Sequence, residues 1–334
     1  MRYYCSILII GILCAWGSFQ NNYKLDIPEG FPEPVFPEDN LLTIERVKLG
    51  KRLFYDPILS RDSTISCASC HRPELAFTDA KPKGIGIRGQ EVARNSPTLV
   101  NVAYQSKGLF HDQGVPSLEM QILVPSQEVK EFDLPLLLAA ERLKNDSIYR
   151  IWSQKAYGRE PDPFVITRAI AAFERTLIGG NSKFDQFYYQ KDSTALSISE
   201  QRGMDLFFDS LSCAKCHSGF NFTNLALENN GLYEVYADSG RMRITLKEED
   251  RDLFKVPTLR NIALTGPYMH DGSIQTLEEV IAHYEKGGVN HKHKSHLLEP
   301  LTLSTEEKED LLSFLRALTD YTFVQNPDFV PSEE

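Results

Sequence analysis

Apolar residues recur at helical spacing in the middle of the chain. After residue 163 they fall on one face of a helix, at Ile166, Ile170, Phe173 and Leu177. Asp162 and Pro163 precede this run and are typical of a helix start, where the aspartate caps the first turn and the proline occupies its first position. The pattern predicts a helix over residues 163–177.

Two further segments carry a similar pattern. Ser304 and Glu307 have the spacing of a capping box, and leucines follow them at positions 311, 312, 315 and 318. Residues 199–208 have the same helical character, and no series of alternating strands is present. We therefore expect an all-α fold, with an extended, proline-rich arm at residues 31–39 and a domain boundary at residues 179–182.

The first residues have the composition of a secretion signal. Arg2 supplies a positive charge, and a mainly apolar stretch follows over residues 7–16. This stretch is too short to span a bilayer, because a spanning helix needs roughly 18 apolar residues or more. We expect residues 1–22 to be removed on export. Leu13 is bulkier than the residue that usually precedes a lipidated cysteine, so Cys14 is not expected to carry a lipid anchor.

Four cysteines remain after residue 22, in two Cys-x-x-Cys pairs that are each followed directly by histidine. The copies consist of Cys67, Cys70 and His71, and of Cys213, Cys216 and His217. This is the attachment signal for c-type haem, in which both thiols bond to the haem and the histidine ligates iron. Disulfides, a zinc site or a redox dithiol would also use the cysteines, but they leave the two histidines unexplained. The sequence predicts two covalent haem c groups.

The sequence around the two haem signals is itself repeated in the same order. Residues 49–56 match residues 202–209, and residues 97–103 match residues 257–263. Further along, His111 and Asp112 match His270 and Asp271. We therefore expect an internal duplication, with two cytochrome c-like haem domains at residues 23–178 and 179–334.

These repeats, together with the Pro-Tyr-Met-His-Asp-Gly segment at residues 267–272, resemble the bacterial di-haem cytochrome c peroxidases. The same superfamily includes MauG, a di-haem enzyme that oxidises residues of a precursor protein. The resemblance extends from about Leu41 to Thr319. It implies that the amino-terminal haem, ligated by His71, is the peroxide site, and that the other haem, ligated by His217, transfers electrons.

Many members of this family close the peroxide site at rest with a histidine in the position of Ile87. Isoleucine cannot ligate iron, so we expect a haem that is open to peroxide without reductive activation. The family uses a glutamate and a preceding glutamine to assist cleavage of the O–O bond, and Glu131 and Gln121 match that pair. Glu131 belongs to an acidic run that would equally suit the surface, and Glu128 is the alternative.

The second haem should have a sixth ligand, and in many family members this is a methionine in the position of Tyr284. MauG-like members use tyrosine there, and a phenolate stabilises ferric iron. We favour Tyr284, with His283, Met269 and Met242 as the alternatives and a packing role for Tyr284 also open.

Three other groups of residues follow from the resemblance or from composition. His111 stands where the family usually has a tryptophan between the haems, and both it and His270 are expected in a haem pocket. Family members hold calcium between the domains with one asparagine side chain and two backbone carbonyls, in the places of Asn95, Thr265 and Pro267. The histidines at positions 291, 293 and 296 are expected in a solvated loop.

The resemblance implies a periplasmic peroxidase that reduces hydrogen peroxide with electrons from a small donor protein such as a cytochrome c, and it allows a homodimer. A MauG-like oxidase is the first alternative, favoured by Tyr284 and opposed by His111. A non-catalytic electron carrier is the second, but it would need two six-coordinate haems. The formal net charge of -10 gives no indication of a nucleic-acid partner.

Overall fold

The computed structural model describes residues 21–331. Cys14 and all but the last two residues of the predicted signal segment lie outside the described residues. The α-helices are α1 (Ile44–Tyr55), α2 (Leu118–Gln121), α3 (Leu123–Gln127), α4 (Leu136–Lys144), α5 (Ser147–Tyr157), α6 (Pro163–Glu174), α7 (Lys183–Tyr188), α8 (Ile198–Asp205), α9 (Met242–Thr245), α10 (Leu277–Glu285), α11 (Thr305–Ala317) and α12 (Tyr321–Val324). Two short strands, β1 (Leu227–Glu228) and β2 (Phe254–Lys255), pair antiparallel. The fold is helix-rich with little strand, in agreement with the predicted class. No helix within residues 21–331 has the length and apolar character needed to cross a membrane.

The predicted helix starts are confirmed in atomic detail. The Asp162 side chain accepts a hydrogen bond from Val165 N at 2.9 Å at the start of α6. Ser304 and Glu307 form the capping box of α11. The segment at 199–208 is not one regular helix, because α8 changes at Leu206 into a π-helical turn that ends at Ser210.

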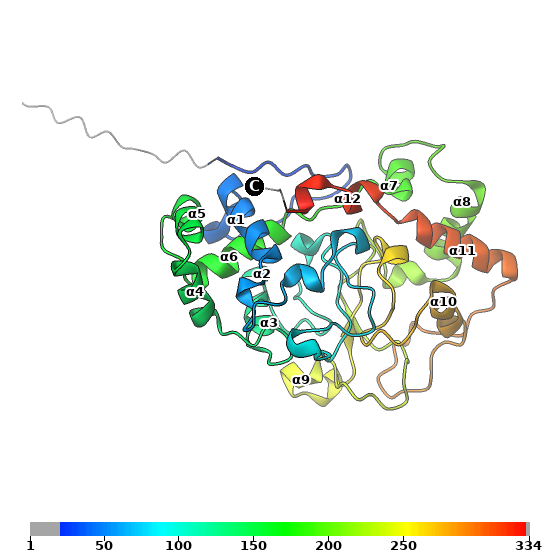
Figure 1. Ribbon diagram of the computed structural model, residues 1–334. Helices are drawn as coiled ribbons and strands as arrows, with labels where there is room; N and C mark the ends of the chain where they lie inside the picture. Colours follow the sequence, from blue (N-terminus) through cyan, green and yellow to red (C-terminus); the bar gives the residue numbers. More distant parts are fainter. Residues whose placement is uncertain (1–20, 332–334) are drawn as a thin grey trace, which may run out of the picture.

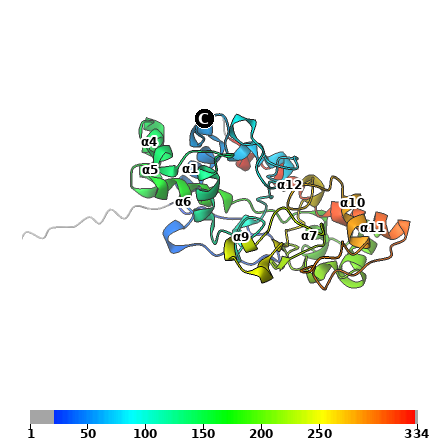
Figure 2. The ribbon, with the colours of Figure 1, turned by 90° about the horizontal axis from the view of Figure 1, so that it is seen from below.

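The helices gather into two lobes that lie side by side. One lobe contains α1 to α6 and the other contains α7, α8, α10 and α11, while α12 lies between them (Figures 1 and 2). In the first lobe α1 crosses α6, and in the second α8 crosses α11. Gly50 of α1 lies directly on the backbone of α6, and Gly203 of α8 lies directly on that of α11, so a Cβ at either position would overlap a carbonyl oxygen. Matching segments of the sequence thus form the same helix crossing in each lobe.

The two ends of the described chain connect the lobes. Phe31 of the amino-terminal arm packs against Tyr104 of the first lobe and Phe220 of the second. At the other end, Phe323 and Phe329 pack against Phe77 in the core of the first lobe. Segments far apart in sequence therefore hold the lobes together.

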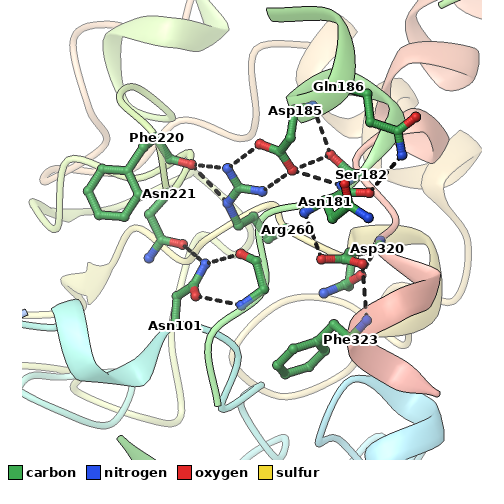
Figure 3. A network of polar contacts seen from close by, with 12 residues as sticks. Asn101, Asn181, Ser182, Asp185, Gln186, Phe220, Asn221, Arg260, Asp320 and Phe323 are labelled. Carbon is green, nitrogen blue, oxygen red and sulfur yellow. Dashed lines mark hydrogen bonds and ion pairs between the residues drawn. The ribbon is translucent and has the colours of Figure 1, made fainter. Parts of the chain in front are cut away.

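A buried polar network lies at the junction of the lobes (Figure 3). The Asn101 side chain bonds to both backbone groups of Gly179, at 3.0 Å from N and 2.9 Å from O, and donates to Asn221 Oδ1 at 3.1 Å. Nearby, Arg260 and Asp185 form a two-pronged ion pair with both N–O distances at 2.8 Å. Both side chains are almost fully buried, and hydrogen bonds of this kind fix one relative position of the segments that they join.

Candidate functional site

The first Cys-x-x-Cys-His segment presents its histidine in one fixed orientation. Cys67–Ser69 forms a 3-10 turn, and His71 N donates to Cys67 O at 3.0 Å. The His71 ring is held by its Nδ1 atom, which lies 2.8 Å from Phe77 O. Burial lowers the pKa of His71, so the ring is neutral. Its Nε2 atom is then the nitrogen that can bind a metal, as in most protein histidine ligands.

The second segment repeats this arrangement. Cys213–Lys215 forms the turn, and His217 Nδ1 lies 3.2 Å from both Phe222 O and Pro257 O. Burial lowers the pKa of His217 to about 4, so this ring is neutral too. The backbone carbonyl that orients each histidine belongs to a phenylalanine shortly after it, with a positive φ in both lobes.

The four cysteines after residue 22 are all free thiols, with no disulfide between them. Within residues 21–331 no group of three or more histidine, cysteine or acidic side chains is arranged to hold a metal ion. Each pair instead stands beside one histidine whose Nε2 is available. Two thiols and one oriented imidazole are the donor set of a covalent haem c, and the residues present fit that group.

Glu131 lies close to the first cysteine pair. Burial is the main cause of the raised pKa of Cys67 and Cys70, and the charge of Glu131 adds to it at both thiols. Ile87 N donates to Glu131 O at 3.1 Å and so fixes the loop that carries the carboxylate. Burial, with a smaller effect of Glu128, raises the pKa of Glu131 to about 7. Glu131 is half-buried whereas Glu128 is exposed, so Glu131 is the carboxylate better placed for the site.

Two other polar side chains of the first lobe each have one buried oxygen atom without a hydrogen-bond partner among the described residues. Gln121 ends α2, and its Oε1 atom has no partner among the described residues. Glu174 of α6 also has one buried oxygen without a partner there, and burial raises its pKa to about 8. Its charge adds to the burial that raises the pKa of Cys67. An unpaired buried oxygen costs about 1–3 kcal/mol, so such groups are typical of functional sites. Gln121 was predicted from the sequence and Glu174 was not.

Tyr284 lies near the second cysteine pair, close to the end of α10. Burial raises its pKa to about 12, a hydrogen bond with the Asn230 side chain opposes that shift, and the charges of Cys213 and Cys216 add to it. Asn230 is therefore a second residue that the sequence did not single out.

The alternative ligands His283 and Met269 also contact Asn230. Asn230 Nδ2 donates to Met269 Sδ at 3.1 Å, and His283 Nε2 lies 2.9 Å from Asn230 O. Met242, the last alternative, is the first residue of α9. The residue before it, Arg241, donates to Asp112 O in the first lobe at 3.0 Å. The structure thus brings three of the four candidates to one residue.

His111 and His270 are linked through Asn95 at the junction of the lobes. His111 Nε2 lies 2.9 Å from Asn95 O, and Asn95 N donates to His270 O at 2.9 Å. Burial lowers the pKa of His111 to about 4. The His270 ring stacks on Phe254, with ring centroids 3.9 Å apart.

The residues in the predicted calcium positions come from both lobes. The hydrogen bond between Asn95 N and His270 O joins Asn95 to the segment that contains Thr265 and Pro267. Asn95 Nδ2 donates to Lys81 O at 2.8 Å, which leaves its Oδ1 atom as the side-chain group that could bind a cation.

A charged network beside these residues was not predicted. Asp112 is fully buried and binds Arg94 and Arg243, each at 2.6 Å, while Arg94 also binds Asp238 at 2.6 Å. Arg94 and Asp112 belong to the first lobe and the others to the second, so the network joins the lobes. The two pairs that join the lobes, Arg94–Asp238 and Arg243–Asp112, each link residues more than 100 positions apart, so no local pattern indicates them.

The expectation of a solvated histidine loop was wrong for His291. Its side chain is buried, with Nε2 3.2 Å from Asp252 Oδ2. The ring also contacts Tyr236, with centroids 5.2 Å apart. His296 is exposed, as expected.

Comparison with known proteins gives consistent matches. The sequence profile of the di-haem cytochrome c peroxidase family matches residues 44–194. The methylamine utilization protein MauG of Methylorubrum extorquens is 36% identical over 296 residues, which cover 87% of this chain and 82% of that protein. Cytochrome c551 peroxidase of Nitrosomonas europaea is 34% identical, over 85% of this chain and 82% of that protein. A solved structure of a MauG-like protein associated with microbial copper homeostasis has a TM-score of 0.86 and 34% identity, over 92% of this chain and 98% of that chain.

Proposed function

The chain belongs to the di-haem cytochrome c peroxidase family, and we propose that it reduces hydrogen peroxide to water with electrons from a small cytochrome or similar donor. The observation that carries this proposal is the position of Glu131. A half-buried carboxylate beside the first cysteine pair, with a pKa of about 7, is the group that peroxide cleavage needs.

In this proposal His71 would hold the haem of the first lobe through Nε2, and that group would supply the redox chemistry for the reduction of peroxide. Glu131 takes the proton from the inner oxygen of peroxide and returns it to the outer oxygen, which leaves as water. Gln121 donates from its amide nitrogen and orients the peroxide. The buried Ile87 stands beside Glu131 in place of a ligand, so peroxide would reach this site without prior reduction.

The second lobe serves electron transfer in this proposal. His217 would hold its haem, and Tyr284 would be the second residue of this lobe to bind the iron. A phenolate at this position lowers the reduction potential.

A MauG-like oxidase, acting on tyrosine or tryptophan of another protein, is the second candidate. The position of Tyr284 near Cys213 and Cys216 favours it. A steady-state assay with peroxide and a reduced small cytochrome c separates the two activities. Rapid turnover supports the peroxidase, whereas consumption of peroxide with negligible oxidation of the cytochrome supports the oxidase.

Four further features belong to the proposal. We infer that the lobes, at residues 23–178 and 179–334, are haem domains that arose by duplication, because Gly50 and Gly203 form the same helix crossing. Residues 1–22 would direct the protein to the periplasm. Calcium would bind Asn95 Oδ1 and the carbonyls of Thr265 and Pro267. Metal analysis of the purified protein and of Asn95→Ala tests this site, which predicts one calcium ion in the former and none in the latter.

A further inference from the structure

A chain of tyrosines leads away from Tyr284 in the second lobe. Asn230 contacts residues of the second haem site: its Nδ2 donates to Met269 Sδ at 3.1 Å, and its backbone O lies 2.9 Å from His283 Nε2. Its Oδ1 accepts from Tyr236 OH at 3.5 Å. Tyr236 OH has a closer acceptor in Asn229 Oδ1, at 3.3 Å. Asn230 therefore connects Tyr236 to the end of α10 that contains His283 and Tyr284.

Tyr236 in turn contacts Tyr233. The centroids of these two rings are 5.4 Å apart, with the planes at 77°. Tyr233 is followed by the exposed residues Glu234 and Val235, and Val235 is 86% exposed. The short segment 233–236 thus runs from the second haem site to the surface of the protein.

The two phenols differ in what their hydroxyl groups contact. Tyr236 donates to amide oxygens, which are too weakly basic to take its proton. Tyr233 donates to Asp271 Oδ2 at 2.7 Å. Asp271 Oδ1 accepts from Ser273 N at 3.1 Å, so both oxygens of this carboxyl group act as hydrogen-bond acceptors. A phenol becomes a strong acid when it loses an electron, and only Tyr233 of the two has a base in place to accept the proton.

The alternative direction from Tyr236 leads back into the protein. Its ring lies 5.9 Å from that of His270, which stacks on Phe254. His270 joins Asn95 at the junction of the lobes. Neither His270 nor Phe254 is as easily oxidised as a phenol beside a carboxylate. If Tyr236 is oxidised, the stable radical is therefore expected on Tyr233.

We propose that Tyr236 and Tyr233 form a redox-active pair that carries single electrons between a donor at the surface near residue 234 and the second haem site. Tyr233 gives up one electron through Tyr236, and its phenolic proton moves to Asp271. The oxidant is the haem centre oxidised by hydrogen peroxide, so this inference rests on the proposed function. The resulting phenoxyl group then takes one electron from a phenol-type or protein donor at the surface, and the proton returns from Asp271. Electrons and protons therefore balance in each step.

The test uses the full-length holoprotein labelled with ring-deuterated tyrosine. After hydrogen peroxide is added, electron paramagnetic resonance should detect an organic radical whose hyperfine splitting collapses on deuteration, which identifies tyrosine. Tyr233→Phe should lose this signal, and Asp271→Asn should lose most of it. Tyr321→Phe is the matched control, because Tyr321 is a tyrosine of α12 that is 63% exposed, and it should retain the full signal.

A second measurement uses the native protein and needs no variant. A nitroso spin trap added to the native holoprotein with peroxide should be found by mass spectrometry on the peptide that contains Tyr233. Peroxide-dependent changes in haem absorbance, with a trap adduct elsewhere or a radical unaffected by Tyr233→Phe, would overturn this inference and leave the proposed function intact. Peroxide that leaves the haem absorbance unchanged would overturn both.

Discussion

Replacement of Glu131 by glutamine is the most informative change in the first lobe. Glutamine has nearly the same shape as glutamate, but it cannot move a proton between the two oxygens of peroxide. A positioned acid–base group contributes about 10²–10⁴-fold to a rate, so the reaction of the holoprotein with peroxide should slow by about that factor. The pH dependence should change as well. With a pKa of about 7, the native carboxylate is deprotonated roughly tenfold more often at pH 8 than at pH 6, and the native rate should rise accordingly.

Stopped-flow absorbance of the haem after mixing with peroxide, from pH 5 to pH 9, measures both effects. The native protein should show a step centred near the pKa of Glu131, about 7, and Glu131→Gln should show a slow rate without that step. Glu128→Gln is the matched control. It removes the neighbouring charge that helps to raise the pKa of Glu131, so its step should move to lower pH while the limiting rate is retained. A Glu131→Gln variant with the native rate and the native step would refute this reasoning.

Three other changes test other parts of the structure. Tyr284→Phe should raise the reduction potential of the second haem in spectroelectrochemistry, because phenylalanine cannot ligate iron, and an unchanged potential would show that Tyr284 only packs. Gly50→Ala should lower the free energy of unfolding by about 1–3 kcal/mol or more, since the new methyl group would overlap the backbone at Ala169. Chemical denaturation monitored by circular dichroism measures this, and an unchanged denaturation midpoint would contradict the close contact between α1 and α6. Arg260→Leu should cost about 3–5 kcal/mol in the same assay because it leaves Asp185 buried without its partner, and the double variant with Asp185→Leu should recover much of the loss.

The haem-attachment segments and the main helices were predictable because their signals are local. A cap such as Asp162 and its partner Val165 lie three residues apart, so a short window of sequence contains both. The correspondence of Asn101 and Asn261 was likewise recognisable, because both lie in the repeated segments of the sequence. Their structural role was not, because each adopts a left-handed conformation and bonds to a segment beyond the end of a distant helix.

The residues that the sequence did not reveal are those whose roles depend on contacts between distant segments. Glu174 reads as one polar position in an apolar helix, and only the fold shows that one of its oxygens is buried and unpaired. Asn230 lies in a loop with no recognisable motif, yet it contacts Tyr284 and Met269. His291 was misjudged for the same reason, since the carboxylate that lies 3.2 Å from its ring belongs to Asp252, in a distant segment of the chain.

The central claim is that the two haem sites differ, with an open site at His71 and a closed one at His217. Electron paramagnetic resonance of the resting ferric holoprotein, before and after addition of hydrogen peroxide, tests this claim most directly. We expect one high-spin and one low-spin signal at rest, and peroxide should consume the high-spin signal. Two low-spin signals that peroxide leaves unchanged would contradict the account and indicate an electron carrier.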